Sequence, residues 1–164
     1  MSPPGRLRQS GFSLVELLVV FAIVGIVTAV GAPGLFDYMR NARLREAGNL
    51  MLGEAIFARN EAIKRNRAVR LTVSGKQTIV TEVATATEMR TKEFAYPIVV
   101  NGSAQAVTFD STGRLPMGTS MAVSLLHGSD TCSSELRCPQ LRVSSGGQIC
   151  IKTLNVTVTP DPCP

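Results

Sequence analysis

The N-terminal region carries one carboxylate inside an otherwise apolar stretch. Between residues 12 and 36, only Ser13, Glu16 and Thr28 are neither apolar nor glycine or proline. A carboxylate within a membrane span costs on the order of 2.5–3.5 kcal/mol on insertion scales, so Glu16 must have a partner or a role. An opposite charge would neutralise it, because pairing removes two uncompensated charges from an apolar interior. The alternative is that Glu16 lies at the headgroup level near the start of a helix.

The four cysteines, Cys132, Cys138, Cys150 and Cys163, all lie in the last third of the chain. An even number confined to one region indicates disulfides formed in an oxidising compartment. Three pairings are open, and Cys132 with Cys138 and Cys150 with Cys163 is favoured because each pair closes a local loop. A zinc site is the rival interpretation, but the spacing CSSELRC and a single histidine, His127, argue against it.

Catalytic and cofactor-binding motifs are missing from the sequence. It contains no phosphate-binding loop, nucleotide-binding glycine pattern, metal-binding histidine pair or nucleophile elbow. A catalytic triad would have to combine His127 with scattered serines. Residues 125–129 (LLHGS) are instead typical of a strand that runs into a turn. We therefore expect no enzyme activity, no cofactor and no metal site.

Positive charge is concentrated in one part of the chain, which has a net charge of +5. From Arg40 to Arg70 there are eight basic residues against three acids, whereas the remainder after Arg70 has seven of each. Lys64, Arg65, Arg67 and Arg70 form a basic cluster within this part. Such a cluster could contact DNA through its phosphates, with strong salt dependence and little base specificity. The alternative is a solvated helix end.

The apolar run over residues 12–36 is long enough to cross a membrane as a helix. Its 25 residues would span ~37 Å at ~1.5 Å per residue. A secretory signal peptide is the competing explanation, with Arg6 and Arg8 as its basic region and residues 29–31 as a small-residue cleavage site. Against it, the run exceeds the usual ~7–15 residues of a signal core and carries Glu16.

The rest of the chain is predicted to form a helix followed by strands. Small or apolar residues recur at helical spacing up to about Asn66, namely Leu44, Ala47, Met51, Ala55, Ala58 and Ala62. Expected strands then cover residues 69–74, 77–83, 89–95, 106–109, 122–126, 140–143, 148–151 and 155–159. The sequence thus predicts an α+β fold, in which a long N-terminal helix packs on an antiparallel β-sheet head.

The segment GFSLVE at residues 11–16, with a short basic leader before it and an apolar run after it, resembles the class III signal of type IV pilins and type II secretion pseudopilins. In that family a prepilin peptidase cuts after the glycine, the new N-terminal residue is N-methylated, and the glutamate directs assembly. The resemblance implies cleavage between Gly11 and Phe12, methylation of Phe12 and an assembly role for Glu16. Pro33 lies where many members carry a helix-kinking proline, which removes one intrahelical hydrogen bond.

The same resemblance implies a domain organisation, partners and a location. The expected parts are a leader (1–11), a transmembrane and assembly helix (12–36), an amphipathic continuation (37–66) and a β-rich head (67–164). The partners would be other pilin or pseudopilin subunits and the prepilin peptidase. Because Arg40, Arg43 and Arg45 follow the span, the positive-inside rule does not fix its orientation. The resemblance and the cysteines place the leader in the cytoplasm, the single span in the cell inner membrane, and the head in the periplasm or outside the cell.

Two segments of the head, residues 107–114 (VTFDSTGR) and 141–149 (LRVSSGGQI), look like the paired strand-and-glycine-turn motifs of the pseudopilin H (GspH) and FimT/FimU minor pilin family. This implies a pilin-like subunit of a type IV pilus or a type II secretion system, placed at or near the filament tip. DNA-capturing members of the family resemble one another in an arginine-bearing motif near the C-terminus. Residues 145–150 (SGGQIC) lack it, so filament assembly is favoured over DNA capture. The other alternative is a soluble exported β-domain with an ordinary signal peptide.

Overall fold

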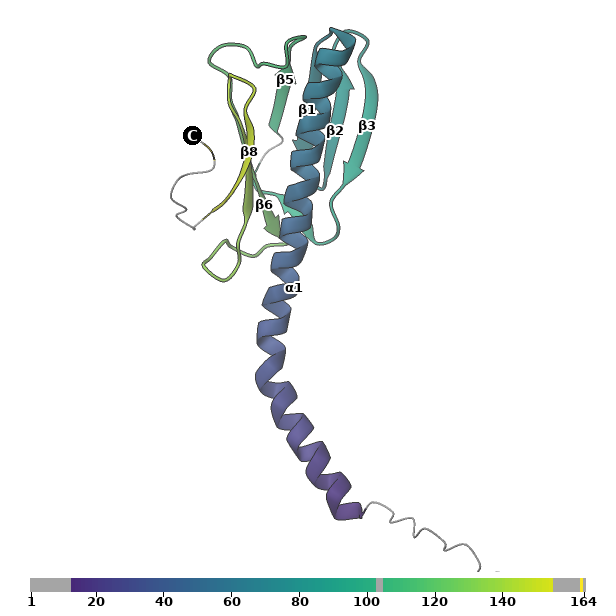
Figure 1. The fold of residues 1–164 in the computed structure, drawn as a ribbon, viewed down its shortest axis with the longest axis vertical. Coiled ribbons are helices and arrows are strands. Elements are labelled where there is room, and N and C mark those ends of the chain that lie inside the picture. Colours follow the sequence, from purple (N-terminus) through teal and green to yellow (C-terminus); the bar gives the residue numbers. More distant parts are fainter. Residues whose placement is uncertain (1–12, 103–104, 155–162, 164) are drawn as a thin grey trace, which may run out of the picture. The chain divides into compact units, whose positions relative to one another are not determined.

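The computed structural model describes residues 13–102, 105–154 and 163, apart from the side chain of Pro33 (Figure 1). Within them, a 52-residue helix, α1 (Leu14–Arg65), precedes a series of strands. The chain divides into two compact units, Met1–Phe36 and Asp37–Pro164. We call residues 13–36 the stem and residues 37–164 the head, and each is described by itself.

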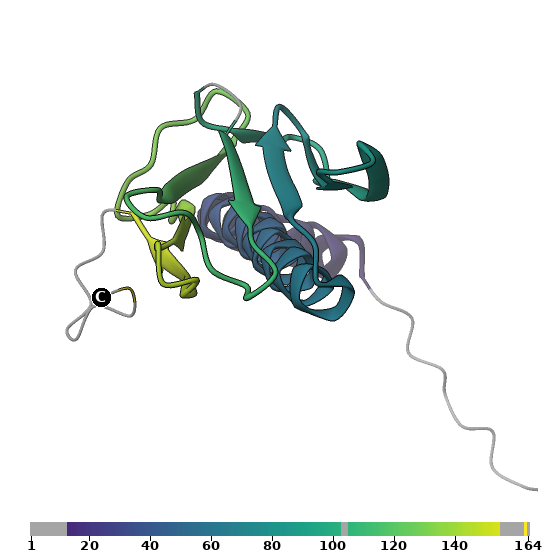
Figure 2. The ribbon, with the colours of Figure 1, turned by 90° about the horizontal axis from the view of Figure 1, so that it is seen from above.

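The head part of α1 buries the side that the helical spacing predicts. All six predicted residues from Leu44 to Ala62 are at most 3% exposed. Most of them are alanines, so the helix can approach the strands closely. A Cβ on Gly48 would lie 2.9 Å from the Cβ of Pro139, which shows how near the next layer is. Figure 2 shows the strands arching around this part of the helix, and the α+β prediction is confirmed.

The strands form two four-stranded antiparallel sheets. The first has the order β3-β2-β1-β5, with β1 (Val69–Ser74), β2 (Gln77–Glu82), β3 (Thr87–Glu93) and β5 (Gln105–Phe109). The second has the order β4-β6-β7-β8, with β4 (Ile98–Val100), β6 (Met121–His127), β7 (Pro139–Val143) and β8 (Ile149–Thr153). Strands β1 and β7 alternate apolar and polar residues, and one face of each sheet joins the core with α1.

The β1–β2 hairpin shows how the pattern fixes the register. Val69, Leu71 and Val73 point into the core and are fully buried, while Arg70 on the opposite face is exposed. The turn places Gly75 at φ 57°, in the left-handed region that glycine enters without steric cost. Ser74 then pairs with Gln77, and the six-residue ladder follows from that turn.

One strand is missing from the sequence prediction, one is shifted, and one expected strand lies outside the described residues. Strand β4 was not predicted, because three apolar residues are too short for a period of two to be visible and its partner β6 is distant in the sequence. Strand β3 is shifted from the expected residues 89–95 to Thr87–Glu93, and a bulge at Val80/Thr81 offsets its pairing with β2. The strand expected at residues 155–159 lies outside the described residues.

The core also contains a charge that the amphipathic pattern did not predict. Glu54 on α1 is 4% exposed, and the Arg90 Nε of β3 lies 3.2 Å from its Oε1. The same guanidinium stacks 4.7 Å from the ring centroid of Phe57. Arg90 therefore attaches β3 to α1, and Met89 of the same strand is half-buried against the core.

Candidate functional site

Glu16 lies in the first turn of α1, where a serine caps the helix. The Oγ of Ser13 accepts a hydrogen bond from the backbone N–H of Glu16 at 3.2 Å, and the Ser13 carbonyl accepts one from Leu17 at 3.2 Å. Ser13 and Glu16 stand at the spacing of a capping box, and a carboxylate is favourable beside a helix N-terminus. Gly11 and Phe12 lie outside the described residues, so the predicted cleavage, methylation and assembly roles stay predictions.

The stem presents apolar side chains on its whole surface. Leu14, Phe21 and Val30 are 76%, 65% and 78% exposed, and the other large apolar residues of the stem resemble them. Among the described helices, α1 is long and apolar enough to cross a membrane, with a mean hydropathy of 2.6 in its most apolar window. A helix that is apolar all round requires lipid or other protein to cover it.

Pro33 lies inside α1, which continues without a break on both sides of it. Its ring removes one backbone donor from the helical ladder. The described neighbours Gly31 and Gly34 have no heavy atom within 4 Å of an added Cβ, so no residue in the described part of the chain packs closely against them. The predicted kink at Pro33 remains a prediction.

The predicted basic cluster at the end of α1 contains acidic partners. Lys64 Nζ lies 3.5 Å from Glu61 Oε1, and Arg65 Nε donates a hydrogen bond to Glu61 Oε2 at 2.7 Å. Glu82, at the end of β2, accepts a hydrogen bond from Arg67 Nη1 at 2.8 Å and lies 3.6 Å from Arg65 Nη1. The two carboxylates offset part of the charge that made this cluster a candidate for DNA contact.

The hydrogen bond from Arg65 is the main cause that lowers the pKa of Glu61, with the charge of Lys64 adding to it. The same bond raises the pKa of Arg65. Arg70, the fourth member of the cluster, instead donates from Nε to the Oγ1 of Thr108 at 3.4 Å. Glu61 could have been identified as a partner, because it precedes Lys64 and Arg65 by three and four residues on one helix.

Both disulfides join the cysteines that the short loops favoured. Cys132 pairs with Cys138 and Cys150 with Cys163, at sequence separations of 6 and 13. We call residues 132–138 the disulfide loop. Within the described ranges, no group of three or more His, Cys, Asp or Glu side chains could hold a metal ion.

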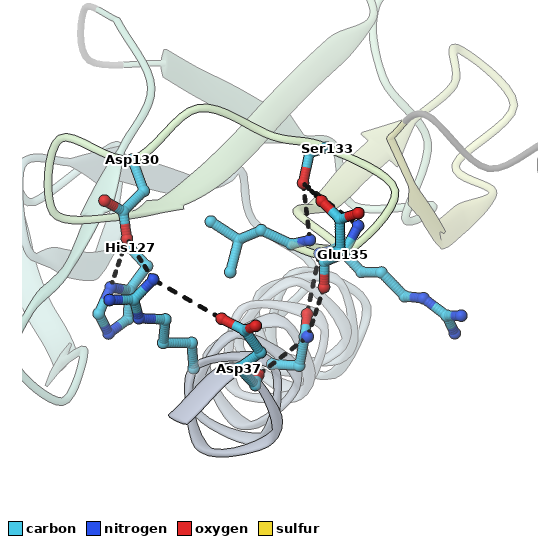
Figure 3. Close-up of polar contacts among 9 residues, drawn as sticks. Asp37, His127, Asp130, Ser133 and Glu135 are labelled. Carbon is cyan, nitrogen blue, oxygen red and sulfur yellow. Dashed lines mark hydrogen bonds and ion pairs between the residues drawn. The ribbon is translucent and has the colours of Figure 1, made fainter. Parts of the chain in front are cut away.

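An asparagine of α1 fastens the disulfide loop, whose Ser133 and Glu135 are labelled in Figure 3. Asn41 Nδ2 donates a hydrogen bond to the carbonyl oxygen of Glu135 at 2.6 Å, and its Oδ1 accepts one from the N–H of Arg137 at 2.8 Å. Inside the loop, Ser133 Oγ accepts a hydrogen bond from the N–H of Leu136 at 3.0 Å. We call the two bonds of Asn41 the latch. The latch could not be predicted from sequence, because Asn41 lies more than 90 residues from both backbone groups that it contacts.

His127, the only histidine, contacts a carboxylate at the end of β6. Its Nδ1 lies 3.1 Å from Asp130 Oδ2. Arg40 Nη1 lies 4.0 Å from the same oxygen and 3.7 Å from Asp37 Oδ1, so the four side chains form one ionic group (Figure 3). The predicted strand-to-turn transition at His127 is observed, with Gly128 at φ 61°.

The two glycine-turn motifs of the head meet in space. The turns contain Gly113 at φ 75° and Gly147 at φ 80°. A Cβ on Gly147 would overlap the carbonyl oxygen of Gly113, and the N–H of Leu115 donates to the carbonyl of Ser145 at 3.2 Å. In the first turn, Asp110 Oδ1 accepts hydrogen bonds from the following backbone and a hydroxyl. The two segments thus form one joint between the ends of β5 and β7.

Comparison with known families accounts for both halves of the chain. Residues 6–32 match the prokaryotic N-terminal methylation motif. Residues 47–147, which are more than half of the chain, match the model of the type II transport protein GspH. The chain belongs to the GspH family. The resemblance found at residues 11–16 and in the two head motifs is thereby confirmed.

The curated relatives of this GspH-family protein match it over a short segment. It is 44% identical over 46 residues to the fimbrial protein EcpC of Eikenella corrodens, which covers 28% of this chain and 30% of the relative. It is 48% identical over 46 residues to the type IV major pilin protein PilE of Neisseria gonorrhoeae, covering 28% of each chain. The chain therefore spans less than a third of the length of these relatives.

A solved structure matches the GspH-family protein over much more of its length. The crystal structure of the type IV minor pilin FimU of Pseudomonas aeruginosa superposes with a TM-score of 0.57 at 18% identity. The alignment covers 72% of this chain and 97% of that one. At this identity the likeness shows the fold, which is that of a pilin.

Membership of the GspH family makes the chain a structural pilin-type protein and not an enzyme. The methylation motif implies processing by prepilin peptidase, and the pilin family implies assembly with other pilins. An apolar N-terminal helix of this kind is consistent with anchoring in the inner membrane before assembly. These statements set the frame for a more specific function.

Proposed function

We propose that the protein is a minor pilin or pseudopilin of a type IV pilus or a type II secretion system. Prepilin peptidase cuts the precursor between Gly11 and Phe12, and Phe12 becomes the N-methylated terminus. Residues 12–36 hold the subunit in the inner membrane until it enters a filament at or near the tip. Glu16 then pairs with the terminal amine of a neighbouring subunit, and the disulfide-bonded head lies outside the inner membrane.

One observation carries the proposal: a methylation motif over residues 6–32 precedes a GspH head in a chain whose stem is uncovered. The apolar side chains of the stem cannot remain in water, because each buried CH₂ group is worth about 0.8 kcal/mol. Lipid can cover them before assembly, and neighbouring stems can do so afterwards. The carboxylate of Glu16 still lacks an opposite charge in that apolar environment, and an amine supplies one.

Two features favour the type IV pilus over the secretion system. The head carries two disulfides. Its C-terminal residues 160–164 (PDPCP) are rich in proline. Subunits that co-purify with the assembled protein will identify the machine, since the two systems have different major subunits.

The N-terminal sequence and mass of the mature protein test the processing step. We expect a chain that starts at Phe12 with one methyl group on its amine. A start near Ala32 would identify an ordinary signal peptide and leave a soluble exported β-domain, which would remove the filament role. A matched Gly11→Val precursor should remain uncut in the membrane.

Replacement of Glu16 tests the assembly step. Glu16→Ala should be cut and methylated normally, yet its incorporation into filaments should fall by at least about tenfold, because the neighbouring amine loses its buried partner. Glu46→Ala is the control, since Glu46 is an exposed carboxylate on the same helix. Filament and membrane fractions are compared by quantitative mass spectrometry. Normal incorporation of Glu16→Ala would exclude the proposed role of Glu16.

DNA capture is the alternative, and gel retardation of the full chain in detergent tests it. Glu61 and Glu82 already hold Lys64, Arg65 and Arg67 in ion pairs, so we expect no retardation at low salt. Retardation that disappears when these three basic residues are neutralised would establish DNA binding instead.

A further inference from the structure

A small hollow opens between α1 and the start of the second sheet in the head. Its volume is about 140 Å³. It is lined by Asn41, Arg45, Gly48, Asn49, Arg137, Pro139, Ile151 and Thr153. Two of the lining residues are arginines and none is acidic, so the hollow is electropositive.

The two arginines come from distant parts of the sequence. Arg45 projects from α1, whereas Arg137 belongs to the disulfide loop that the latch holds against the helix. The backbone N–H of Arg137 is itself one of the latch donors, which fixes this residue beside Asn41. The head therefore uses a disulfide and an asparagine to place a second guanidinium next to the first.

These guanidinium groups differ from the neighbouring Arg40 in having no acidic partner. Arg40 pairs with Asp37 and Asp130. Arg45 and Arg137 are exposed, and neither forms an ion pair with any residue that the structure describes. Two like charges held at one hollow repel each other, so their arrangement favours an anion that both can contact.

The position of Arg45 in the chain identifies the anion. It follows Phe36, the last apolar residue of the proposed span, by nine residues, which is about 14 Å of helix. The headgroup layer adds roughly 5–8 Å to each side of the hydrocarbon core, and the surface potential extends a further ~8 Å at physiological salt. An arginine at that distance lies within the electrostatic reach of membrane phosphates.

We propose that this hollow binds the phosphate of an anionic phospholipid headgroup while the stem is still in the membrane. The inference rests on the proposed anchoring of residues 12–36. Guanidinium groups pair with phosphate oxygens in bidentate fashion, and Asn49 and Thr153 line the hollow with further donors. The contact orients the head on the membrane, and it is lost when the subunit leaves the bilayer for a filament.

Photolabelling of the full chain tests the proposal. The mature protein is placed in phosphatidylcholine nanodiscs that contain either photoactivatable phosphatidylglycerol or photoactivatable phosphatidylcholine. We expect the glycerol lipid to label peptides around Arg45 and Arg137 severalfold more than the choline lipid. Each charge-assisted guanidinium contact with the bound phosphate should contribute at least roughly fivefold, so Arg45→Gln with Arg137→Gln should lower the labelling about twentyfold or more.

The control removes the same charge outside the hollow. Arg43→Gln with Arg142→Gln neutralises two exposed arginines, of which Arg43 is on α1 two residues before Arg45 and about 200° around the helix from it. This variant should keep at least half of the labelling. Thermal unfolding of the head, followed by near-UV circular dichroism, shows that each variant is folded.

Three outcomes would overturn the lipid assignment. Equal loss in both double variants would show a general charge effect without a site. Competition by inorganic phosphate at low millimolar concentration would show a site for free anions. Labelling that is equal for the two lipids would show that the hollow selects no headgroup charge. Resistance of the wild-type chain to carbonate extraction reports membrane anchoring separately, so failure of the proposed function is distinguished from failure of this inference.

Discussion

The stem exposes its large apolar side chains, whereas the head buries most of its own. In the stem, Phe21 and Val30 are more than 60% exposed, and no strand or loop of the described chain covers them. In the head, Leu44 and Met51 on the same helix are fully buried against two sheets. One continuous helix thus carries an external surface for other molecules and an internal surface for its own fold.

This difference shows where each part obtains its stability. The head closes its own core, uses two disulfides, and fastens the disulfide loop and strand β3 to α1 with Asn41 and Arg90. The stem has its backbone hydrogen bonds and a serine cap, and its large apolar side chains are exposed. Changes in the head should therefore act on folding, and changes in the stem should act on membrane insertion and assembly.

Truncation of matched leucines gives the largest expected contrast. Leu44→Ala should destabilise the head by about 2–5 kcal/mol, because it leaves a cavity at a fully buried position. Leu35→Ala, at a 62% exposed position of the stem, should leave the unfolding of the head unchanged. Urea unfolding in detergent, followed by near-UV circular dichroism, measures both. A comparable loss in Leu35→Ala would mean that the stem contributes to the fold of the head.

Replacement of glycines by alanine gives a second comparison of the head with the stem, because the space around the backbone differs between these positions. Gly147→Ala should destabilise the head by about 2–4 kcal/mol, because a methyl group would overlap the Gly113 carbonyl at a positive φ. Gly118→Ala has a similar φ of 79° but open space, so it should cost only about 1–2 kcal/mol. Gly31→Ala in the stem should not affect the head. Equal effects at Gly147 and Gly118 would show that the two glycine turns are not closely joined.

Removal of one disulfide at a time compares two regions within the head. Loop-closure entropy predicts a loss of about 2 kcal/mol for Cys132→Ser with Cys138→Ser, and about 3 kcal/mol for Cys150→Ser with Cys163→Ser, because the second loop is longer. Thermal unfolding measures the order. In addition, the first variant should raise hydrogen exchange at the backbone N–H of Arg137, which donates to Asn41. Unchanged exchange there would show that the latch holds without its disulfide.

The smallest effect is the pH dependence at the first glycine turn. Hydrogen bonds to Asp110, above all from the Thr112 hydroxyl and then from the Arg114 backbone, lower the pKa of this carboxyl. A lowered folded-state pKa contributes stability above the unfolded value of about 4, which is lost as the pH falls through the folded value. Asp110→Asn should therefore flatten the stability profile below about pH 4. A profile parallel to that of the wild type would remove Asp110 from this role.

Much of the fold was predictable, because its signals are local. The helical spacing from Leu44 to Ala62 identified the buried face of α1, since neighbouring turns place those residues on one side. The alternation in β1 and the glycine at its turn identified the first hairpin. Strand β4 was not predicted, because its pairing with β6 is non-local and its three residues are too few to show a period.

The predicted site residues also divide into those with a local signal in the sequence and those whose contacts are non-local. Glu16 was identifiable because a charge in an apolar run is visible without any structure. The basic cluster was visible too, but Glu82, which holds Arg67, reaches it only through the pairing of β1 with β2. Glu54 and Arg90 gave no signal, because their contact joins a helix to a strand some 36 residues later in the chain.

The sequence alone determined that this chain has an apolar, charge-marked N-terminal helix and a disulfide-bonded β-rich head. Those properties follow from runs, spacings and composition, which a reader can count along the chain. The tertiary structure alone decided that Arg137 lies beside Arg45, that Asn41 fastens the disulfide loop, and that the two glycine turns meet. These contacts join residues more than 30 positions apart, and only the packing of the sheets on α1 brings them within a few ångströms.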